Sequence, residues 1–250
     1  SEIAAVVRET RIVAYEDLIE DEQETFRKIR EATEADRSDG FDPGDCRPQS
    51  RFDPAAMFDE LLGIVRERIE KAPLRELVES IFTDNREALL TCPAARHNHH
   101  AFAGGLLEHT LSVARTAVDL ADKYAEYYPD MKPPLGKDLV VAGAVLHDVG
   151  KLRELGDEPE GTVYTAEGAM IGHMLQGRDM VREASAGRKI DPETFLRLEH
   201  LIIAHQRLPE WGSPKPPMTP EALIVHYADD LDAKLHMMQA ILREARNPGP

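Results

Sequence analysis

One short stretch, residues 145–151 (VLHDVGK), limits what this chain of 250 residues can fold into. It closes the apolar run 139–146, which predicts a buried helix. A histidine and an aspartate at the end of such a helix would be buried, and burying an unpaired charge is costly. The cost falls if both side chains ligate a metal ion, because the ion supplies the compensating charge. The stretch therefore predicts a metal centre inside a helical core, with the cation of Lys151 beside it.

Composition sets the broad class of protein. Hydrophobic residues make up 42% of the chain, enough for a sizeable core. The net charge of −16 argues against extensive electrostatic contacts with nucleic acid, because such contacts need many lysines and arginines. Residues 1–45 hold 14 acidic and 6 basic side chains, a net of −8. Two cysteines give no disulfide framework, and no apolar run approaches the roughly 20 residues of a membrane span, so we expect a cytoplasmic protein without membrane contact.

Helical periodicity runs through most of the chain after residue 50, where Asp53-Pro54 predicts a helix start. Residues 154–165 predict a loop, and no strand is expected after residue 50. Before residue 50, residues 3–15 could form a strand or the edge of a further domain, and residues 17–35 predict a polar helix. Residues 38–52 predict a linker or a clamped loop. Apolar spacing predicts helices at about 54–69, 74–82, 85–91, 105–127, 139–146, 166–185, 192–205 and from 220 onward. The expected fold is all-α, a helical bundle with a metal site in its core.

Several histidines and aspartates lie near the middle or the end of these predicted helices. A lone histidine on an apolar helix is usually an ordinary core residue. The prediction therefore depends on the set as a whole: His109, His147, Asp148, His173, His200, His205 and Asp229. Imidazole and carboxylate ligands suit Mn, Fe, Co or Ni, with Mg or Zn as further options. The absence of cysteine from the set disfavours a structural zinc site.

The candidate ligands divide into two groups around one shared carboxylate. The first ion would be held by His109, His147, Asp148 and Asp229, and the second by His173, His200 and His205 with Asp148 bridging. Two ions roughly 3.5–4 Å apart can activate a water and stabilise the leaving oxygen of a phosphoester. His200 and His205 diverge by about 140° on an ideal helix. We therefore prefer His205 as a ligand, and His200 could instead contact substrate or a group behind the ligands.

Other side chains have both a functional and an ordinary interpretation. Lys151 could hold a phosphate as a mobile point charge, or pair with Glu154 at the surface. His99 and His100 could line the mouth of the pocket or belong to a solvated loop. Trp211 could stack on a base or pin its proline-rich loop, and we favour the loop.

Three further features carry less weight. Asp230 and Asp232 are expected on a solvated or capping face, although Asp232 could support Lys234 or a ligand histidine. A zinc knuckle using Cys92 and His97 would need more ligands than that stretch offers.

The order His … His-Asp … Asp, here His109, His147-Asp148 and Asp229, resembles the signature of the HD-domain metal-dependent phosphohydrolases. Six stretches carry a closer resemblance: 99–110, 146–151, 167–173, 200–205, 211–214 and 226–234. They are similar to the HD domain of the YhaM-like exoribonuclease family. Members of that family often have an OB-fold before this domain, where this chain has an acidic segment. They also have His-Gly where this chain has Gln206-Arg207.

The resemblance implies an HD domain over residues 51–250, after an acidic segment and linker at 1–50. It implies cleavage of phosphoester bonds by a metal-activated water, most similar to a 3′-5′ exonuclease acting on a single-stranded end. Asp148 and Lys151 would be catalytic, and His100 and Lys151 would bind substrate. A smaller nucleotide stays open as the substrate. The alternative is a regulatory HD-fold module that binds a nucleotide or a partner without turnover, and the oligomeric state is left open.

Overall fold

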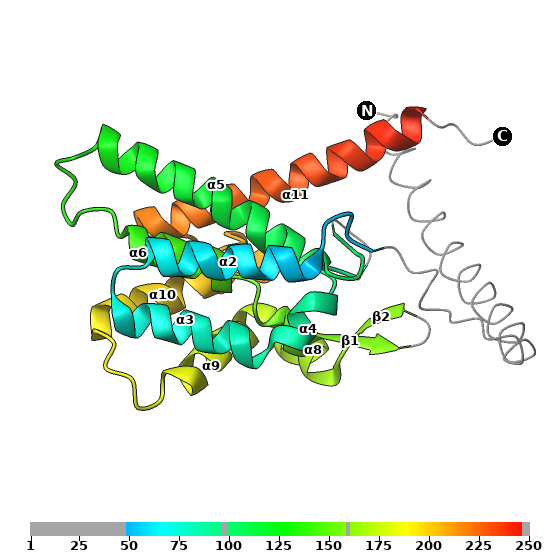
Figure 1. The fold of residues 1–250 in the computed structure, drawn as a ribbon, viewed down its shortest axis with the longest axis horizontal. Helices are drawn as coiled ribbons and strands as arrows, with labels where there is room; N and C mark the ends of the chain where they lie inside the picture. The colour runs from blue at the N-terminus through cyan, green and yellow to red at the C-terminus, as the bar shows by residue number, and fades with distance from the viewer. Residues whose placement is uncertain (1–48, 97–99, 159–160, 247–250) are drawn as a thin grey trace, which may run out of the picture. The chain divides into compact units, whose positions relative to one another are not determined.

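A computed structural model of this chain describes residues 49–96, 100–158 and 161–246 (Figure 1). The expected N-terminal strand, the polar helix and most of the linker lie outside the described residues, as do His97 and His99. No helix in the described part is both long and apolar enough to cross a membrane. The cytoplasmic location and the domain boundary after residue 50 stay predictions.

Three helices form the first part of the bundle: α2 (Pro54–Arg68), α3 (Ala72–Asp84) and α4 (Arg86–Thr91). α2 begins where the sequence predicts, because the Asp53 carboxylate accepts a hydrogen bond from the Ala55 N–H at 3.0 Å. The apolar residues at helical spacing in α2 and α3 are buried: Phe58, Leu61, Leu62, Val65, Leu74, Leu77, Val78, Ile81 and Phe82.

The helix α6 (Lys137–Leu146) lies at the centre of the bundle and packs against α2, α3, α5, α10 and α11. Its residues 139–146 are all buried, so the apolar run forms the predicted buried helix. The long helix α5 (Gly105–Tyr127) has the predicted bounds and packs against both α6 and α11 (Figure 1). The C-terminal end of α6 therefore lies where side chains of several helices can meet.

Residues 154–165 are not the plain loop that the sequence predicts. Two four-residue strands, β1 (Leu155–Glu158) and β2 (Gly161–Tyr164), pair antiparallel with Leu155 opposite Tyr164. The expectation of no strand after residue 50 is therefore wrong at this hairpin. Four-residue strands are too short for apolar periodicity to reveal them.

The expected single helix at 166–185 is two helices, α8 (Ala166–Ile171) and α9 (His173–Ser185). Gly172 lies between them with a φ of 80°, a value that glycine adopts without steric cost. The break places His173 at the start of α9, next to the short helix α7 (Lys151–Glu154). The backbone N–H of His173 donates to the Glu154 carboxylate at 2.9 Å, which joins the two helices.

The bundle is completed by α10 (Pro192–Ala204), the short 3-10 helix η2 (Pro209–Trp211) and α11 (Pro220–Arg246). The Asp191 carboxylate caps α10 by accepting from the Thr194 N–H at 2.9 Å, as the Asp-Pro pair predicts. α10 and α11 both pack against α6. Apart from the hairpin, the described residues confirm the expected all-α bundle.

Candidate metal centre

The end of α6 presents His147 and Asp148 inside the bundle, and both side chains are almost completely buried. His147 Nδ1 lies 2.8 Å from the carbonyl oxygen of Ala144, to which it can donate. His205, at the end of α10, repeats this arrangement with the carbonyl oxygen of Ile202 at 2.7 Å. With Nδ1 used in this way, each imidazole offers Nε2 to the Asp148 carboxylate.

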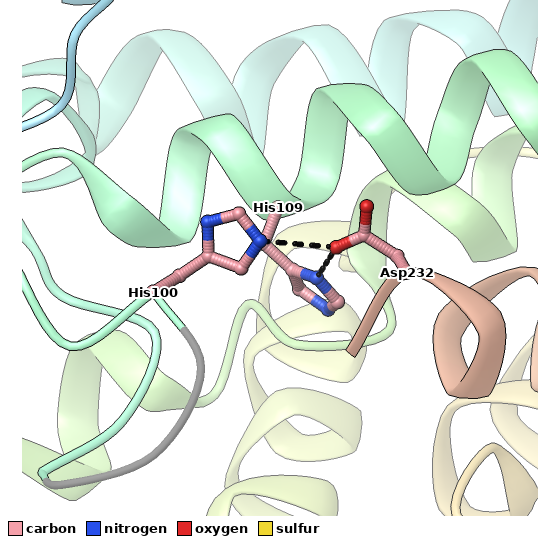
Figure 2. A group of neighbouring side chains, drawn as sticks. All are labelled: His100, His109 and Asp232. Atoms are coloured by element: carbon pink, nitrogen blue, oxygen red, sulfur yellow. Dashed lines mark hydrogen bonds and ion pairs between the residues drawn. The ribbon is translucent and has the colours of Figure 1, made fainter. Parts of the chain in front are cut away.

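At two other histidines, a carboxylate oxygen and not a backbone carbonyl oxygen lies next to Nδ1. Asp232 Oδ2 lies 2.7 Å from His109 Nδ1, a pair that Figure 2 shows. Glu154 Oε1 lies 3.1 Å from His173 Nδ1. A carboxylate behind a ligating imidazole fixes its tautomer and raises its basicity. All four rings therefore have an acceptor at Nδ1 and leave Nε2 for the centre.

The first group of donor atoms gathers around Asp148 Oδ2. His109 Nε2 lies 3.6 Å and His147 Nε2 3.5 Å from this oxygen, and the two nitrogens are 3.3 Å apart. Asp229 Oδ1 lies 3.1 Å from His109 Nε2 and 3.9 Å from His147 Nε2. The structure thus brings together the four residues that the sequence analysis assigned to a first ion.

The second group gathers around the other oxygen of the same carboxylate. Asp148 Oδ1 lies 3.4 Å from His173 Nε2 and 3.5 Å from His205 Nε2. Asp148 Oδ1 and His205 Nε2 are both buried and make no hydrogen bond within the described part of the chain. A buried polar atom without a hydrogen bond is costly, and a metal ion would satisfy both atoms. This donor set of imidazoles and one carboxylate therefore fits a divalent metal.

The charge states also suit metal ligation. Burial lowers the pKa of His147 to about 4, so its imidazole is neutral and can ligate. Burial would raise the pKa of Asp148, but the neighbouring Lys151 and His147 hold it well below its usual range. Burial would lower the pKa of His109, but the carboxylates of Asp229 and Asp232 raise it to about 9. Without a metal, this pocket therefore attracts positive charge.

Lys151 is not the surface lysine of its ordinary interpretation. Its side chain is buried, and its Nζ lies 2.6 Å from Asp148 Oδ2. Glu154, the surface partner considered for it, accepts hydrogen bonds from His173 instead. Burial would lower the pKa of Lys151, but the contact with Asp148 raises it, so the ammonium keeps its charge beside the centre.

A cavity of about 340 Å³ opens beside the second group of donors. Lys151 and His173 belong both to this cavity and to the surroundings of Asp148. A substrate in the cavity would therefore lie next to the candidate metal ligands. Tyr164, Gln206 and Trp211 also line the cavity.

His100 is not among the residues that line this cavity. It is buried, and its Nε2 lies 3.1 Å from Asp232 Oδ2, so it shares this carboxylate with His109 (Figure 2). Its ring also packs on the ring of His236, with centroids 3.9 Å apart. The structure therefore places His100 behind a ligand, and not at the pocket mouth that the sequence analysis considered.

The structure does not bring His200 to the centre. Its Nε2 accepts a hydrogen bond from the backbone N–H of Met218 at 2.9 Å. Position 200 lies on a different side of α10 from His205, as the angle between the two positions predicts. His200 is therefore left out of the ligand set, and it holds the segment before α11 in place.

Two carboxylates orient histidines of this centre, and the sequence predicted their roles only in part. Asp232 was expected on a solvated or capping face, with support of a ligand histidine as an alternative, and the structure places it behind His109. Glu154 was considered only as a surface partner of Lys151, whereas it orients His173, 19 positions along the chain. The pairing depends on how α7 and α9 pack, and no local sequence pattern signals it.

The fold and the site define a class: a helical domain that gathers four histidines and two aspartates into a buried centre able to hold divalent metal. The HD-domain family model matches residues 106–234, which include all six of these residues. This chain belongs to the HD-domain family. A second family model, described as a putative helicase, matches residues 57–154.

The chain is similar to curated proteins named 3′-5′ exoribonuclease YhaM. It is 45% identical over 157 residues to those of Bacillus licheniformis and Bacillus subtilis strain 168, which covers 63% of this chain and 47% of each relative. The match thus spans about half the length of these relatives. It is 34% identical over 246 residues to that of Shouchella clausii, covering 98% of this chain and 74% of the relative. No solved structure matches this chain significantly.

Proposed function

We propose that this chain is a metal-dependent phosphohydrolase that removes nucleotides from the 3′ end of single-stranded RNA. One observation carries the proposal: both oxygens of the Asp148 carboxylate face two imidazole Nε2 atoms each, at 3.4–3.6 Å. A carboxylate shared in this way is suited to bridge two divalent ions. The exoribonuclease names of the relatives support RNA as the substrate.

The residues that would hold the metal are those of the two donor groups. The first group is His109, His147, Asp148 and Asp229, and the second is Asp148, His173 and His205. Nitrogen and oxygen donors without thiolate favour Mn, Fe, Co or Ni. When bound, such ions supply Lewis-acid stabilisation of phosphoryl oxygens and lower the pKa of water.

The other residues prepare the site for a phosphate group. Lys151 adds a fixed positive charge at the wall of the cavity, held at 2.6 Å by Asp148. An ammonium in this position stabilises negative charge on a phosphate that enters from the cavity. Asp232 and Glu154 keep His109 and His173 oriented for ligation.

The proposal is tested with the purified chain and a single-stranded RNA oligonucleotide labelled at its 5′ end. We expect Mn²⁺-dependent shortening of the RNA from its 3′ end, and loss of this activity in Asp148→Asn. Asp230→Asn is the matched control, because Asp230 lies on the same bundle but pairs with Lys234 at 2.6 Å, away from the centre. The proposal fails if the chain binds metal but hydrolyses neither RNA nor a generic phosphodiester. That result would favour the non-catalytic HD-fold module.

A further inference from the structure

We infer that the cavity beside Lys151 and His173 is a subsite for a single nucleotide, whose base stacks on the indole of Trp211. The inference rests on the proposed function, because it places the terminal nucleotide of the RNA substrate in this cavity. It adds a substrate-binding residue that lies outside the metal centre.

The two sides of the cavity differ in chemistry. Lys151 and His173 form a polar side next to the Asp148 carboxylate. Trp211 from η2 and Tyr164 from the end of β2 supply aromatic rings to the same cavity. A nucleotide has the same division, with an anionic phosphate at one end and a flat base at the other. The arrangement therefore fits a phosphate near Lys151 and a base against an aromatic ring.

The sequence favoured the interpretation that Trp211 holds its loop, but the loop has a second support in Ser213. Its side chain is 51% exposed, whereas Ser213 in the same loop is 2% exposed. The Ser213 hydroxyl donates to the carbonyl oxygen of Ile203 at 3.0 Å, and the Ser213 N–H donates to that of Leu208 at 3.1 Å. Ser213 thus helps to fix the loop, and about half of Trp211 is exposed at the cavity.

Tyr164 offers a second exposed ring. Its side chain is 52% exposed, and it closes the β-hairpin that follows α7. Because the hairpin and η2 contribute one aromatic residue each, a base entering the cavity meets rings from two separate elements. Aromatic residues that stack on bases accept any base, since every base has a π-face. We therefore expect little preference among the four bases.

The cavity fits a single nucleotide better than it fits several nucleotides of a strand. Among the described residues that line it, Lys151 is the only lysine or arginine. Contacts to several successive phosphates would need several such cations. The volume of about 340 Å³ also lies at the small end for ligand pockets.

The inference can be tested by fluorescence, because Trp211 is the only tryptophan in the chain. The Mg²⁺-loaded protein is titrated with adenosine 5′-monophosphate, with excitation above the adenine absorption band. We expect saturable quenching of the Trp211 emission. Ribose 5-phosphate, which lacks the base, should leave the emission unchanged. Absence of quenching by adenosine 5′-monophosphate would overturn the inference.

Variants give a second measurement that does not depend on emission. Trp211→Ala should lower kcat/KM on RNA about tenfold or more, and Trp211→Phe should retain most of it. On an RNA whose 3′-terminal nucleotide lacks its base, wild type and Trp211→Ala should be equal. Tyr127→Ala is the control, because Tyr127 is an exposed aromatic residue on α5 that does not line the cavity.

The outcomes separate this inference from the proposed function. Quenching by adenosine 5′-monophosphate without turnover of any phosphoester would support the subsite and refute the hydrolase. Turnover of RNA that is equally fast in wild type and Trp211→Ala would support the hydrolase and refute the subsite.

Discussion

The His109 Nδ1 on α5 donates to Asp232 Oδ2 on α11 at 2.7 Å, while Nε2 of the same ring lies 3.1 Å from Asp229 Oδ1. Asp232 also accepts hydrogen bonds from His100 and Ser112, so its position is fixed from three directions. The Asp232 carboxylate therefore sets the orientation of His109, which is a candidate metal ligand.

Asp232→Asn should weaken metal binding about ten- to a hundredfold, because a neutral amide no longer raises the basicity of His109. The affinity is measured by calorimetric titration of the chelator-treated protein with Mn²⁺. Asp230→Asn should leave the affinity unchanged, since the Asp230 carboxylate pairs with Lys234 and not with a candidate ligand. Equal affinities in the two variants would show that Asp232 does not act through His109.

Asp148→Ala should abolish binding of both ions, because each oxygen of Asp148 belongs to one donor group. It also leaves the Lys151 ammonium buried without its partner, which costs roughly 3–5 kcal/mol of unfolding free energy. Metal content is measured by elemental mass spectrometry, and stability by urea unfolding.

A double variant separates these two effects. Asp148→Ala/Lys151→Met removes the unpaired cation as well, so it should regain much of the lost stability without regaining metal. A folded double variant that still holds two ions per chain would contradict the bridging role of Asp148.

Gly150→Ala should disturb the second donor group through the backbone of α9, which carries His173. A Cβ at Gly150 would lie 1.9 Å from the carbonyl oxygen of His173 and 2.5 Å from the backbone nitrogen of Gly177. These are backbone atoms of α9, so the helix carrying His173 must move, at a cost of about 1–3 kcal/mol. Urea unfolding and metal stoichiometry together measure the effect.

Gly63→Ala is the control for this prediction, because a Cβ there meets nothing within 4 Å on the exposed side of α2. It should raise the unfolding free energy by roughly 0.5–1 kcal/mol, through the better helix propensity of alanine. If Gly150→Ala behaves like Gly63→Ala, the close approach of α7 and α9 is not needed for the centre.

Removal of metal should destabilise the protein. An ion that binds only the folded chain, present at about a hundred times its Kd, adds about 2.7 kcal/mol to the unfolding free energy. A chelator should therefore lower the Tm of wild type and leave the Tm of Asp148→Ala/Lys151→Met unchanged. The structural reason is that Asp148 Oδ1 and His205 Nε2, both buried, make no hydrogen bond among the described residues. A wild-type Tm that does not respond to the chelator would contradict this prediction.

The helices and most of the candidate ligands that the structure brings together could be predicted because their signals are local. The apolar run that becomes α6 predicted burial of His147 and Asp148, and periodicity gave α5 its bounds. Where the signal was one glycine, as at Gly172, the break between α8 and α9 was missed. The same break positions His173, which was nevertheless named because it lies within the predicted helix 166–185.

The orientation of side chains between helices could not be predicted in the same way. The contact of Glu154 with His173 depends on the packing of α7 against α9. The hydrogen bond of His100 to Asp232 joins residues 132 positions apart. A sequence without related sequences beside it contains no signal for such pairs.

His200 and His205 offer a final test on a single helix. His205 Nε2 lies 3.5 Å from Asp148 Oδ1, whereas His200 Nε2 accepts from the Met218 N–H at 2.9 Å. His205→Ala should lower the metal content to one ion per chain, and His200→Ala should leave two. His200→Ala should instead cost about 1 kcal/mol of stability, because the Met218 N–H loses its acceptor. Elemental mass spectrometry and urea unfolding of both variants measure this, and loss of an ion from His200→Ala would return that residue to the ligand set.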